Sequence, residues 1–296
     1  MEPLEVIRRS HAAMNAHDST GAAMCAAPDV EIQGPTGELR GRDAVQLLAQ
    51  TFMTAFPDNE WVVAHQIASG DTVATEYVLE GTHSGTLHTP MGALVPTGKR
   101  VTSRACDVSR VRDDKIYSSH LYWDNLAFMS ALGIVPLPAM LPLASAFRGR
   151  RWEPAKDVDA TSTEEMAERL RDALNSHDLD DVMRLVARDV EVVAPTVEAD
   201  GSEALRNLIG LYLGAFPDIK WHVMHQISLG DTVVTEQLVE GTHGGQFSTP
   251  QGEFTPTGNN GITRVCQVLR VRHNLIESVH LYWDHLVLMQ TMGAFA

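Results

Sequence analysis

Cysteine is scarce in this sequence, which has three among its 296 residues: Cys25, Cys106 and Cys266. An odd number of cysteines without a CxxC pair excludes the disulfide framework typical of small secreted proteins. Cys106 and Cys266 lie in strand-like runs, where a free cysteine usually acts as a small core residue. We therefore expect a reduced, intracellular chain.

Long apolar runs are also missing. No stretch approaches the roughly 18 consecutive apolar residues that a membrane span requires. The first residues, MEPLEVIRRSHAAMNAHD, lack the apolar segment of a signal peptide. The sequence therefore predicts a cytoplasmic protein that does not enter a membrane.

Basic residues are outnumbered. There are 23 Lys and Arg against 38 Asp and Glu, which gives a formal net charge of −15. Nucleic acids and anionic membranes repel a protein of this charge, so we expect neither as a partner.

The sequence does contain a repeat. Phe56-Pro57-Asp58 recurs as Phe216-Pro217-Asp218, at an offset of 217 − 57 = 160 residues. The same offset relates three further pairs of segments: Gly81-Thr82-His83 and Gly241-Thr242-His243, Pro96-Thr97-Gly98 and Pro256-Thr257-Gly258, and His120-Leu121-Tyr122-Trp123-Asp124 and His280-Leu281-Tyr282-Trp283-Asp284. One constant offset identifies a tandem duplication without insertions or deletions over this span.

The duplication sets the domain boundaries. We predict one domain at 1–135, a linker at 136–160 and a second domain at 161–296. The length of 296 residues suits about two domains, each long enough to bury its own core. The linker is expected because the proline-rich stretch 134–142 has no match in the other copy.

Helix patterns come first in each copy. In the first copy, apolar spacing predicts a helix over 4–16, and Asp18 suits a helix N-cap. A further helix is predicted over 41–55, and a short one over 125–132 that ends at Gly133.

Strand patterns follow. Residues 61–67 and 72–80 alternate with a period of two around a Ser-Gly-Asp turn, which predicts a β-hairpin. Residues 100–112 and 115–124 form a second predicted hairpin around an Asp-Asp turn. Helices followed by hairpins indicate an α+β domain.

This order of elements, with Phe-Pro-Asp before the first long strand, resembles the NTF2-like cone fold. The ordered series GDxV, GTHxG, PTG, RVRxxxI, YWD and LG is similar, more narrowly, to the SnoaL-like polyketide cyclase family. The resemblance implies two cone-shaped α+β barrels, each a curved antiparallel sheet covered by helices. It also implies enzymes without a cofactor that close a polyketide ring by intramolecular aldol chemistry.

The resemblance further implies an acid–base role for an Asp near the end of the last strand, to which Asp124 and Asp284 correspond. Where family members often carry an aromatic residue four positions earlier, this chain has His120 and His280. These histidines are candidates for an acid–base partner or an orienting group. The superfamily also contains epoxide hydrolases, isomerases and binding modules, so the resemblance alone does not fix the function.

Strand alternation places three polar side chains of the last strand on one face, and Leu121 and Trp123 on the other. The polar set is His120, Tyr122 and Asp124, repeated as His280, Tyr282 and Asp284. In an apolar pocket, desolvation would raise the pKa of the Asp toward that of a useful base, and the Tyr could donate to a developing enolate oxygen. The alternative is a hydrogen-bonded network that merely fills the cone.

A regular pairing of the second hairpin would bring Asp107 beside His120, and Gln267 takes the place of Asp107 in the second copy. A second carboxylate raises one pKa of a pair. Because only the first copy has it, we expect the two sites to be unequal.

The face away from the pocket would then carry an apolar stripe that needs a cover. The stripe comprises Leu121, Trp123, Cys106 and Val108, repeated as Leu281, Trp283, Cys266 and Val268. Identical patches related by a twofold axis can cover each other, and the resemblance implies such pairing. We therefore predict that the two repeats pack sheet against sheet as an intramolecular pseudo-dimer. The sequence is also compatible with further association of whole chains into a homo-oligomer.

Other histidines are weaker candidates for the substrate site. Two His–Glu pairs should face each other across the first hairpin of each copy, either as a dyad or as ordinary cross-strand pairs: His65 with Glu76, and His225 with Glu236. His83 and His243 lie at a strand end, where they either line the rim of the site or stabilise a turn.

A metal site is not expected, although the chain has 13 histidines. The sequence contains no HExxH or CxxC, and His88 is replaced by Ser248 in the second copy. It also lacks a Gly-rich phosphate loop and a GxSxG elbow.

The leading hypothesis is a cofactor-independent enzyme for the cyclisation or isomerisation of a polyketide-like or other hydrophobic carbonyl substrate. Asp124 and Asp284 would move the proton. The alternatives are an epoxide-opening enzyme and a carrier that binds a small hydrophobic molecule without changing it.

Overall fold

The computed structural model describes residues 1–89, 92–135, 154–155, 159–195, 197–249 and 252–294. The chain divides into two compact units, one containing Met1–Pro136 and the other containing Pro154–Ala296. Each unit holds one copy of the repeat. Most of the predicted linker, 136–160, lies outside the described residues.

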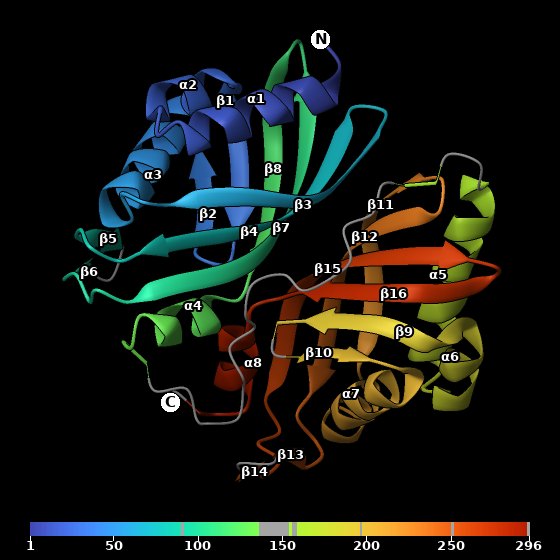
Figure 1. Ribbon diagram of the computed structural model, residues 1–296. Coiled ribbons are helices and arrows are strands. Elements are labelled where there is room, and N and C mark those ends of the chain that lie inside the picture. Colours follow the sequence, from blue (N-terminus) through green and yellow to red (C-terminus); the bar gives the residue numbers. More distant parts are fainter. Residues whose placement is uncertain (90–91, 136–153, 156–158, 196, 250–251, 295–296) are drawn as a thin grey trace. The chain divides into compact units, whose positions relative to one another are not determined.

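Both domains have the same order of elements (Figure 1). The first consists of α1 (Pro3–Asn15), α2 (Ser19–Met24), β1 (Ala26–Gly34), β2 (Gly37–Arg40), α3 (Arg42–Ala55), β3 (Glu60–Ser69), β4 (Thr72–Thr82), β5 (Leu87–Thr89), β6 (Gly92–Leu94), β7 (Arg100–Arg112), β8 (Lys115–Trp123) and α4 (Asn125–Ala131). The second consists of α5 (Ala160–Asn175), α6 (Leu179–Leu185), β9 (Val186–Ala194), β10 (Val197–Asp200), α7 (Ser202–Ala215), β11 (Lys220–Leu229), β12 (Thr232–Thr242), β13 (Phe247–Thr249), β14 (Gly252–Phe254), β15 (Asn260–Arg272), β16 (Leu275–Tyr282) and α8 (His285–Thr291).

The predicted helices and hairpins are confirmed. Asp18 caps α2 by accepting a hydrogen bond from the Gly21 amide at 2.8 Å, and Asp178 caps α6 in the same way from Asp181 at 2.9 Å. No helix within the described ranges has the length and apolar character needed to cross a membrane.

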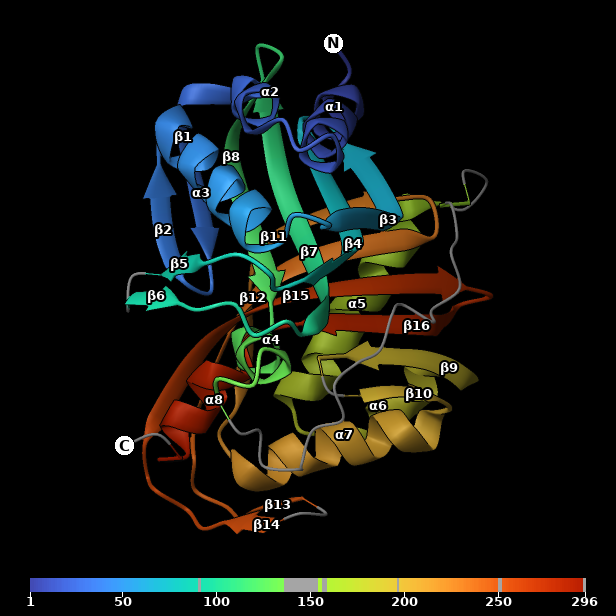
Figure 2. The ribbon, with the colours of Figure 1, turned by 60° about the vertical axis from the view of Figure 1, so that its left-hand side comes forward.

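Each domain is built on a six-stranded sheet, in the order β2-β1-β8-β7-β4-β3 and β10-β9-β16-β15-β12-β11. The sheet is curved but open, because its two outer strands do not pair with each other among the described residues (Figure 2). The α+β class is confirmed, but the purely antiparallel sheet is wrong. β1 pairs parallel with β8, and β9 with β16, through strands that the sequence patterns did not predict.

Helices cover one face of each sheet, the inner face (Figure 2). In the first domain α1 buries Val6 and Ile7 against Val73 and Val111 of the sheet. In the second domain the core between helices and sheet includes Met166, Leu170, Val233, Leu269 and Val271. A cavity between the helices and the sheet would therefore be lined by side chains of the inner face.

A β-bulge in the last hairpin decides which side chains reach that inner face. Arg112 pairs with Lys115 and Val111 with Ile116, but Arg110 pairs with Ser118, so Tyr117 is an extra residue. The second domain repeats the bulge at Glu277. Because side chains alternate with a period of two, a shift of one residue exchanges the faces of the rest of the strand.

The predicted faces of the last strand are therefore wrong. Leu121 lies opposite Asp107, whereas His120 lies opposite Val108 and Tyr122 opposite Cys106. The predicted apolar stripe is split between the two faces: Cys106 and Val108 lie on one, Leu121 and Trp123 on the other. The same holds for Cys266, Val268, Leu281 and Trp283. The stripe thus no longer supports the pseudo-dimer, which stays a prediction.

Candidate functional site

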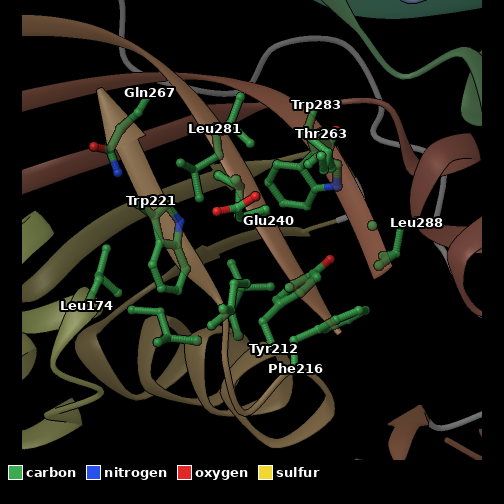
Figure 3. A pocket seen from close by; sticks show the side chains of 18 of the residues that line it. Leu174, Tyr212, Phe216, Trp221, Glu240, Thr263, Gln267, Leu281, Trp283 and Leu288 are labelled. Carbon is green, nitrogen blue, oxygen red and sulfur yellow. The ribbon is translucent and has the colours of Figure 1, made fainter. Parts of the chain in front are cut away.

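The second domain contains a cavity of about 140 Å³ between the sheet and the helices α5, α7 and α8 (Figure 3). In this view Trp221 and Trp283 lie on opposite sides, with Gln267 at one end and Tyr212 and Phe216 at the other. A cavity of about this size can hold a small aromatic molecule. Most of the other lining side chains are aliphatic, including Leu170, Leu174, Leu208, Ile209, Val265, Val279 and Leu281.

The lining confirms the reversal of faces. Leu281, Trp283 and Gln267 line the cavity, whereas His280, Tyr282 and Asp284 are not among its described lining residues. Within that described lining, Glu240 is the only charged residue. The interior is thus an apolar chamber with very few polar groups.

Two amides form a polar contact at the Gln267 end. The Gln237 side-chain amide donates to the Gln267 carbonyl oxygen at 3.1 Å. Both residues are buried, with 4% and 7% of their surface exposed. A side-chain amide does not titrate in water, so this pair offers hydrogen bonds but no acid–base chemistry.

The first domain has a different pair at the same two positions, where Tyr77 replaces Gln237 and Asp107 replaces Gln267. The Tyr77 hydroxyl donates to the Asp107 carboxyl oxygen at 2.9 Å. Burial raises the pKa of Asp107 to about 7, although the hydrogen bond from Tyr77 acts in the opposite direction. Burial, followed by the charge of Asp107, holds the pKa of Tyr77 well above its usual value.

An imidazole and an indole flank this pair. The Tyr77 ring stacks on Trp61 with a centroid distance of 4.8 Å, and the His11 ring lies 5.8 Å from the Tyr77 ring. The His11 Nδ1 atom is buried and has no hydrogen-bond partner among the described residues. Burial lowers the pKa of His11 to about 4, so this imidazole is neutral at pH 7.

The sequence patterns made Asp107 a candidate for the pocket face, but they did not place His11 and Tyr77 beside it. The available signal was that three titratable groups of the first copy are replaced together in the second. His11, Tyr77 and Asp107 correspond to Arg171, Gln237 and Gln267 at the 160-residue offset. Alternation alone could not bring a helix residue and two strand residues to one point.

The buried His11 makes a testable contribution to pH-dependent stability. Its pKa is about 4 in the fold against 6.5 in the unfolded chain, so the unfolded state binds the proton more readily between these values. The contribution is complete above pH 6.5 and is lost as the pH falls toward 4, by about 3 kcal/mol in total. Urea unfolding at pH 7 and pH 4.5 should therefore show a smaller pH-dependent loss in His11→Phe than in the unmodified protein. Equal losses would show that His11 is not buried in its neutral form.

Asp124 and Asp284 lie just beyond the last strand and cap the closing helix. The Asp124 carboxylate accepts a hydrogen bond from the Ala127 amide at 3.2 Å, and Asp284 accepts one from the Leu286 amide at 2.9 Å. Each carboxylate thus satisfies a backbone amide at a helix N-terminus, which is a structural use of the side chain. The expectation that they share a pocket-facing row with His120, Tyr122, His280 and Tyr282 is wrong, because the β-bulge turns that row to the other face.

The predicted His–Glu pairs across the first hairpins are confirmed as contacts. His65 Nδ1 lies 2.9 Å from Glu76 Oε2, and His225 Nδ1 lies 3.4 Å from Glu236 Oε2. Glu76 and Glu236 lie opposite Cys106 and Cys266 in the ladder, on the face of each sheet that its helices do not cover. A substrate-binding role for these pairs inside the cone therefore has no geometric support.

His83 and His243 hold the turn that follows the fourth strand of their domains. His83 Nδ1 lies 3.2 Å from the Thr97 hydroxyl, and the His83 backbone pairs with Lys99 and Gly98. His243 contacts Thr257 in the same way at 3.1 Å. Burial lowers the pKa of both histidines. These contacts agree with the turn-stabilising alternative.

Comparison with known protein families matches both halves of the chain. A family model described as SnoaL-like polyketide cyclase matches residues 4–132, and one described as SnoaL-like domain matches residues 167–279. None of the curated proteins matches the sequence.

Solved structures resemble one repeat at a time. IdmH from Streptomyces antibioticus, a candidate polyketide cyclase, is 29% identical, covers 45% of this chain and 99% of its own, and has a TM-score of 0.39. AclR from Streptomyces galilaeus, a candidate hydroxylase, is 20% identical over 46% of this chain and 84% of its own, with a TM-score of 0.42. TsrD from Streptomyces laurentii is 18% identical over 47% of this chain and 100% of its own, with a TM-score of 0.41. Since the two family models together match both repeats, the chain belongs to the SnoaL-like proteins and carries two such domains in tandem.

Proposed function

We propose that this chain is an acid–base enzyme that cyclises or isomerises a hydrophobic carbonyl substrate without a cofactor, and that Asp107 of the first domain is its base. The observation that carries the proposal is the Tyr77–Asp107 pair. It places a buried carboxyl on the inner face of the sheet, with a hydroxyl donor at 2.9 Å. The family model that matches residues 4–132 supports the same class of activity.

The protonation state of Asp107 suits this role. With a pKa of about 7, its carboxyl exists in both forms near neutral pH, which favours a group that must take up a proton and later return it. The deprotonated carboxylate removes a proton from the carbon next to the substrate carbonyl, which leaves an enolate. Once Asp107 holds the proton, the Tyr77 hydroxyl can donate to the enolate oxygen, and the neutral His11 can donate a second N–H from the helix side.

Two outcomes of the enolate are consistent with these groups. In an aldol-type cyclisation its carbon attacks a second carbonyl of the same substrate, and Asp107 returns the proton to the new alkoxide. In an isomerisation the proton returns to another carbon atom. Both reactions conserve protons and electrons, so neither requires an oxidant or a reductant.

Solvent exchange into a simple ketone tests the proposal. The full chain is incubated with 2-tetralone, a neutral bicyclic ketone, in deuterated buffer between pH 5 and 9. We expect catalysed deuterium incorporation next to the carbonyl, with a rate that rises through an apparent pKa near 7 because only the carboxylate form of Asp107 acts as the base.

The alternatives give different products. An epoxide-opening enzyme would convert styrene oxide to a diol that carries oxygen-18 from labelled water, without exchanging the ketone. A carrier would do neither. An exchange rate equal to that of buffer alone, over the whole pH range, would remove the acid–base assignment.

A further inference from the structure

We propose that the second domain is a separate ligand site, which binds a neutral aromatic molecule with a hydroxyl or carbonyl group and leaves it chemically unchanged. The cavity beside Trp221 and Trp283 is the proposed site (Figure 3). This inference does not rest on the activity proposed for Asp107, because the cavity and its polar pair lie entirely within the second domain.

The shape of the cavity follows from a replacement between the repeats. In the first domain the Tyr77 ring stacks on Trp61 and fills the space above it. In the second domain Gln237 stands at the position of Tyr77, and Trp221, the counterpart of Trp61, lines the cavity. The indole face thus becomes available to a flat ligand, for which aromatic side chains are favourable partners.

The charge of the lining selects against ions. No lysine, arginine or histidine is present among the described lining residues, and Glu240 is the one acidic group. An anionic ligand would lose its hydration without gaining a counter-ion, which is costly in an apolar cavity. A neutral molecule does not incur this penalty.

The amide pair supplies polar recognition. The bond of 3.1 Å uses one donor of Gln237 and the carbonyl oxygen of Gln267. Gln267 lines the cavity, and its amide N–H groups provide a donor for a ligand hydroxyl or carbonyl. Neither amide can take up or release a proton near pH 7, so this pair cannot act as the base that we propose for Asp107 in the first domain.

Binding is measured by isothermal titration calorimetry with three probes that share one ring system: 2-naphthol, naphthalene and 2-naphthoate. We expect 2-naphthol to bind the full chain and 2-naphthoate to bind at least about tenfold more weakly. Gln267→Leu should weaken the binding of 2-naphthol by about tenfold, which is the effect of one lost hydrogen bond to a buried partner. It should not weaken the binding of naphthalene.

A matched pair of bulky substitutions locates the site. Thr263 lines the cavity, and Ser103 is its counterpart in the first domain. Thr263→Trp should remove one bound 2-naphthol per chain, whereas Ser103→Trp should leave that molecule bound. Circular dichroism verifies the fold of each variant, and Gln267→Leu serves as the test if Thr263→Trp fails to fold.

Three results would overturn the proposal. One is 2-naphthol binding that neither Gln267→Leu nor Thr263→Trp reduces, and another is 2-naphthoate binding as tight as that of 2-naphthol. The third is exchange of 2-tetralone that Thr263→Trp abolishes and Asp107→Asn does not, because the second domain would then be the active one. By contrast, a protein that binds 2-naphthol as expected but never exchanges 2-tetralone would refute only the activity proposed for Asp107.

Discussion

Asp107→Asn is expected to reduce turnover by about 10²–10⁴-fold while making the protein more stable at alkaline pH. Loss of a general base typically costs about 10²–10⁴-fold in rate. Asparagine has nearly the same shape as aspartate and can still accept the hydrogen bond from Tyr77, but it cannot take up a proton. The substitution therefore separates the chemistry of this position from its packing.

The gain in stability follows from the raised pKa. The carboxyl titrates at about 7 in the fold and at 3.8 in the unfolded chain. Its contribution to stability is present below pH 3.8 and is lost as the pH rises through 7, because the unfolded chain releases the proton first. The full loss is about 4 kcal/mol. The amide of the Asp107→Asn variant does not titrate. The free energy of unfolding of this variant should therefore exceed that of the unmodified protein by up to this amount at pH 8 and by little at pH 4.

Urea unfolding of both proteins at pH 4 and pH 8 measures this difference. The reciprocal control is Gln267→Asp, which places a carboxyl in the second domain at the same position of the repeat. It should destabilise the chain at pH 8 more than at pH 4. If the effect of Asp107→Asn on stability were the same at both pH values, the carboxyl would not be held protonated, and its suitability as a base near pH 7 would be lost.

The sequence was sufficient to predict the main helices and the two hairpins, but not the other strands or the faces of the last strand. Helix periodicity, the Asp18 cap and the turns of both hairpins are local properties of the sequence. Each of them recurs at the constant offset in the second repeat. The pairing of His65 with Glu76 was also predictable, because the ladder is regular from the turn to that point.

The bulge at Tyr117 could not be predicted from local patterns. As the extra residue of a bulge, Tyr117 carries no pattern that distinguishes it from a regular strand residue. Moving the register by one residue exchanged His120 and Tyr122 with Leu121 and Trp123, which moved the predicted catalytic row out of the cone. β1 was missed for a related reason: its parallel pairing with β8 joins segments that no turn connects.

Gly245→Ala is expected to destabilise the second domain by about 3 kcal/mol or more. A Cβ atom at this position would lie 1.8 Å from the Gly214 carbonyl oxygen and 2.9 Å from its carbon. These are backbone atoms near the end of α7, and the Gly245 amide also donates to the Ala215 carbonyl oxygen at 3.0 Å. The clash thus cannot be relieved by turning a side chain, and forced overpacking of this kind costs about 1–3 kcal/mol or more.

The neighbouring glycine provides the control. A Cβ at Gly244 would have its nearest contact at 3.6 Å, with Pro217, which is ordinary van der Waals distance. The first repeat carries Ser84 at this position, so a side chain is already accommodated there. Gly244→Ser should therefore leave the unfolding midpoint in urea nearly unchanged, whereas Gly245→Ala lowers it clearly. Gly85→Ala should do the same in the first domain, where the added Cβ would lie 1.9 Å from the Thr54 carbonyl oxygen. Equal midpoints for Gly244→Ser and Gly245→Ala would mean that the last glycine of the GTHxG motif is not held against the preceding helix.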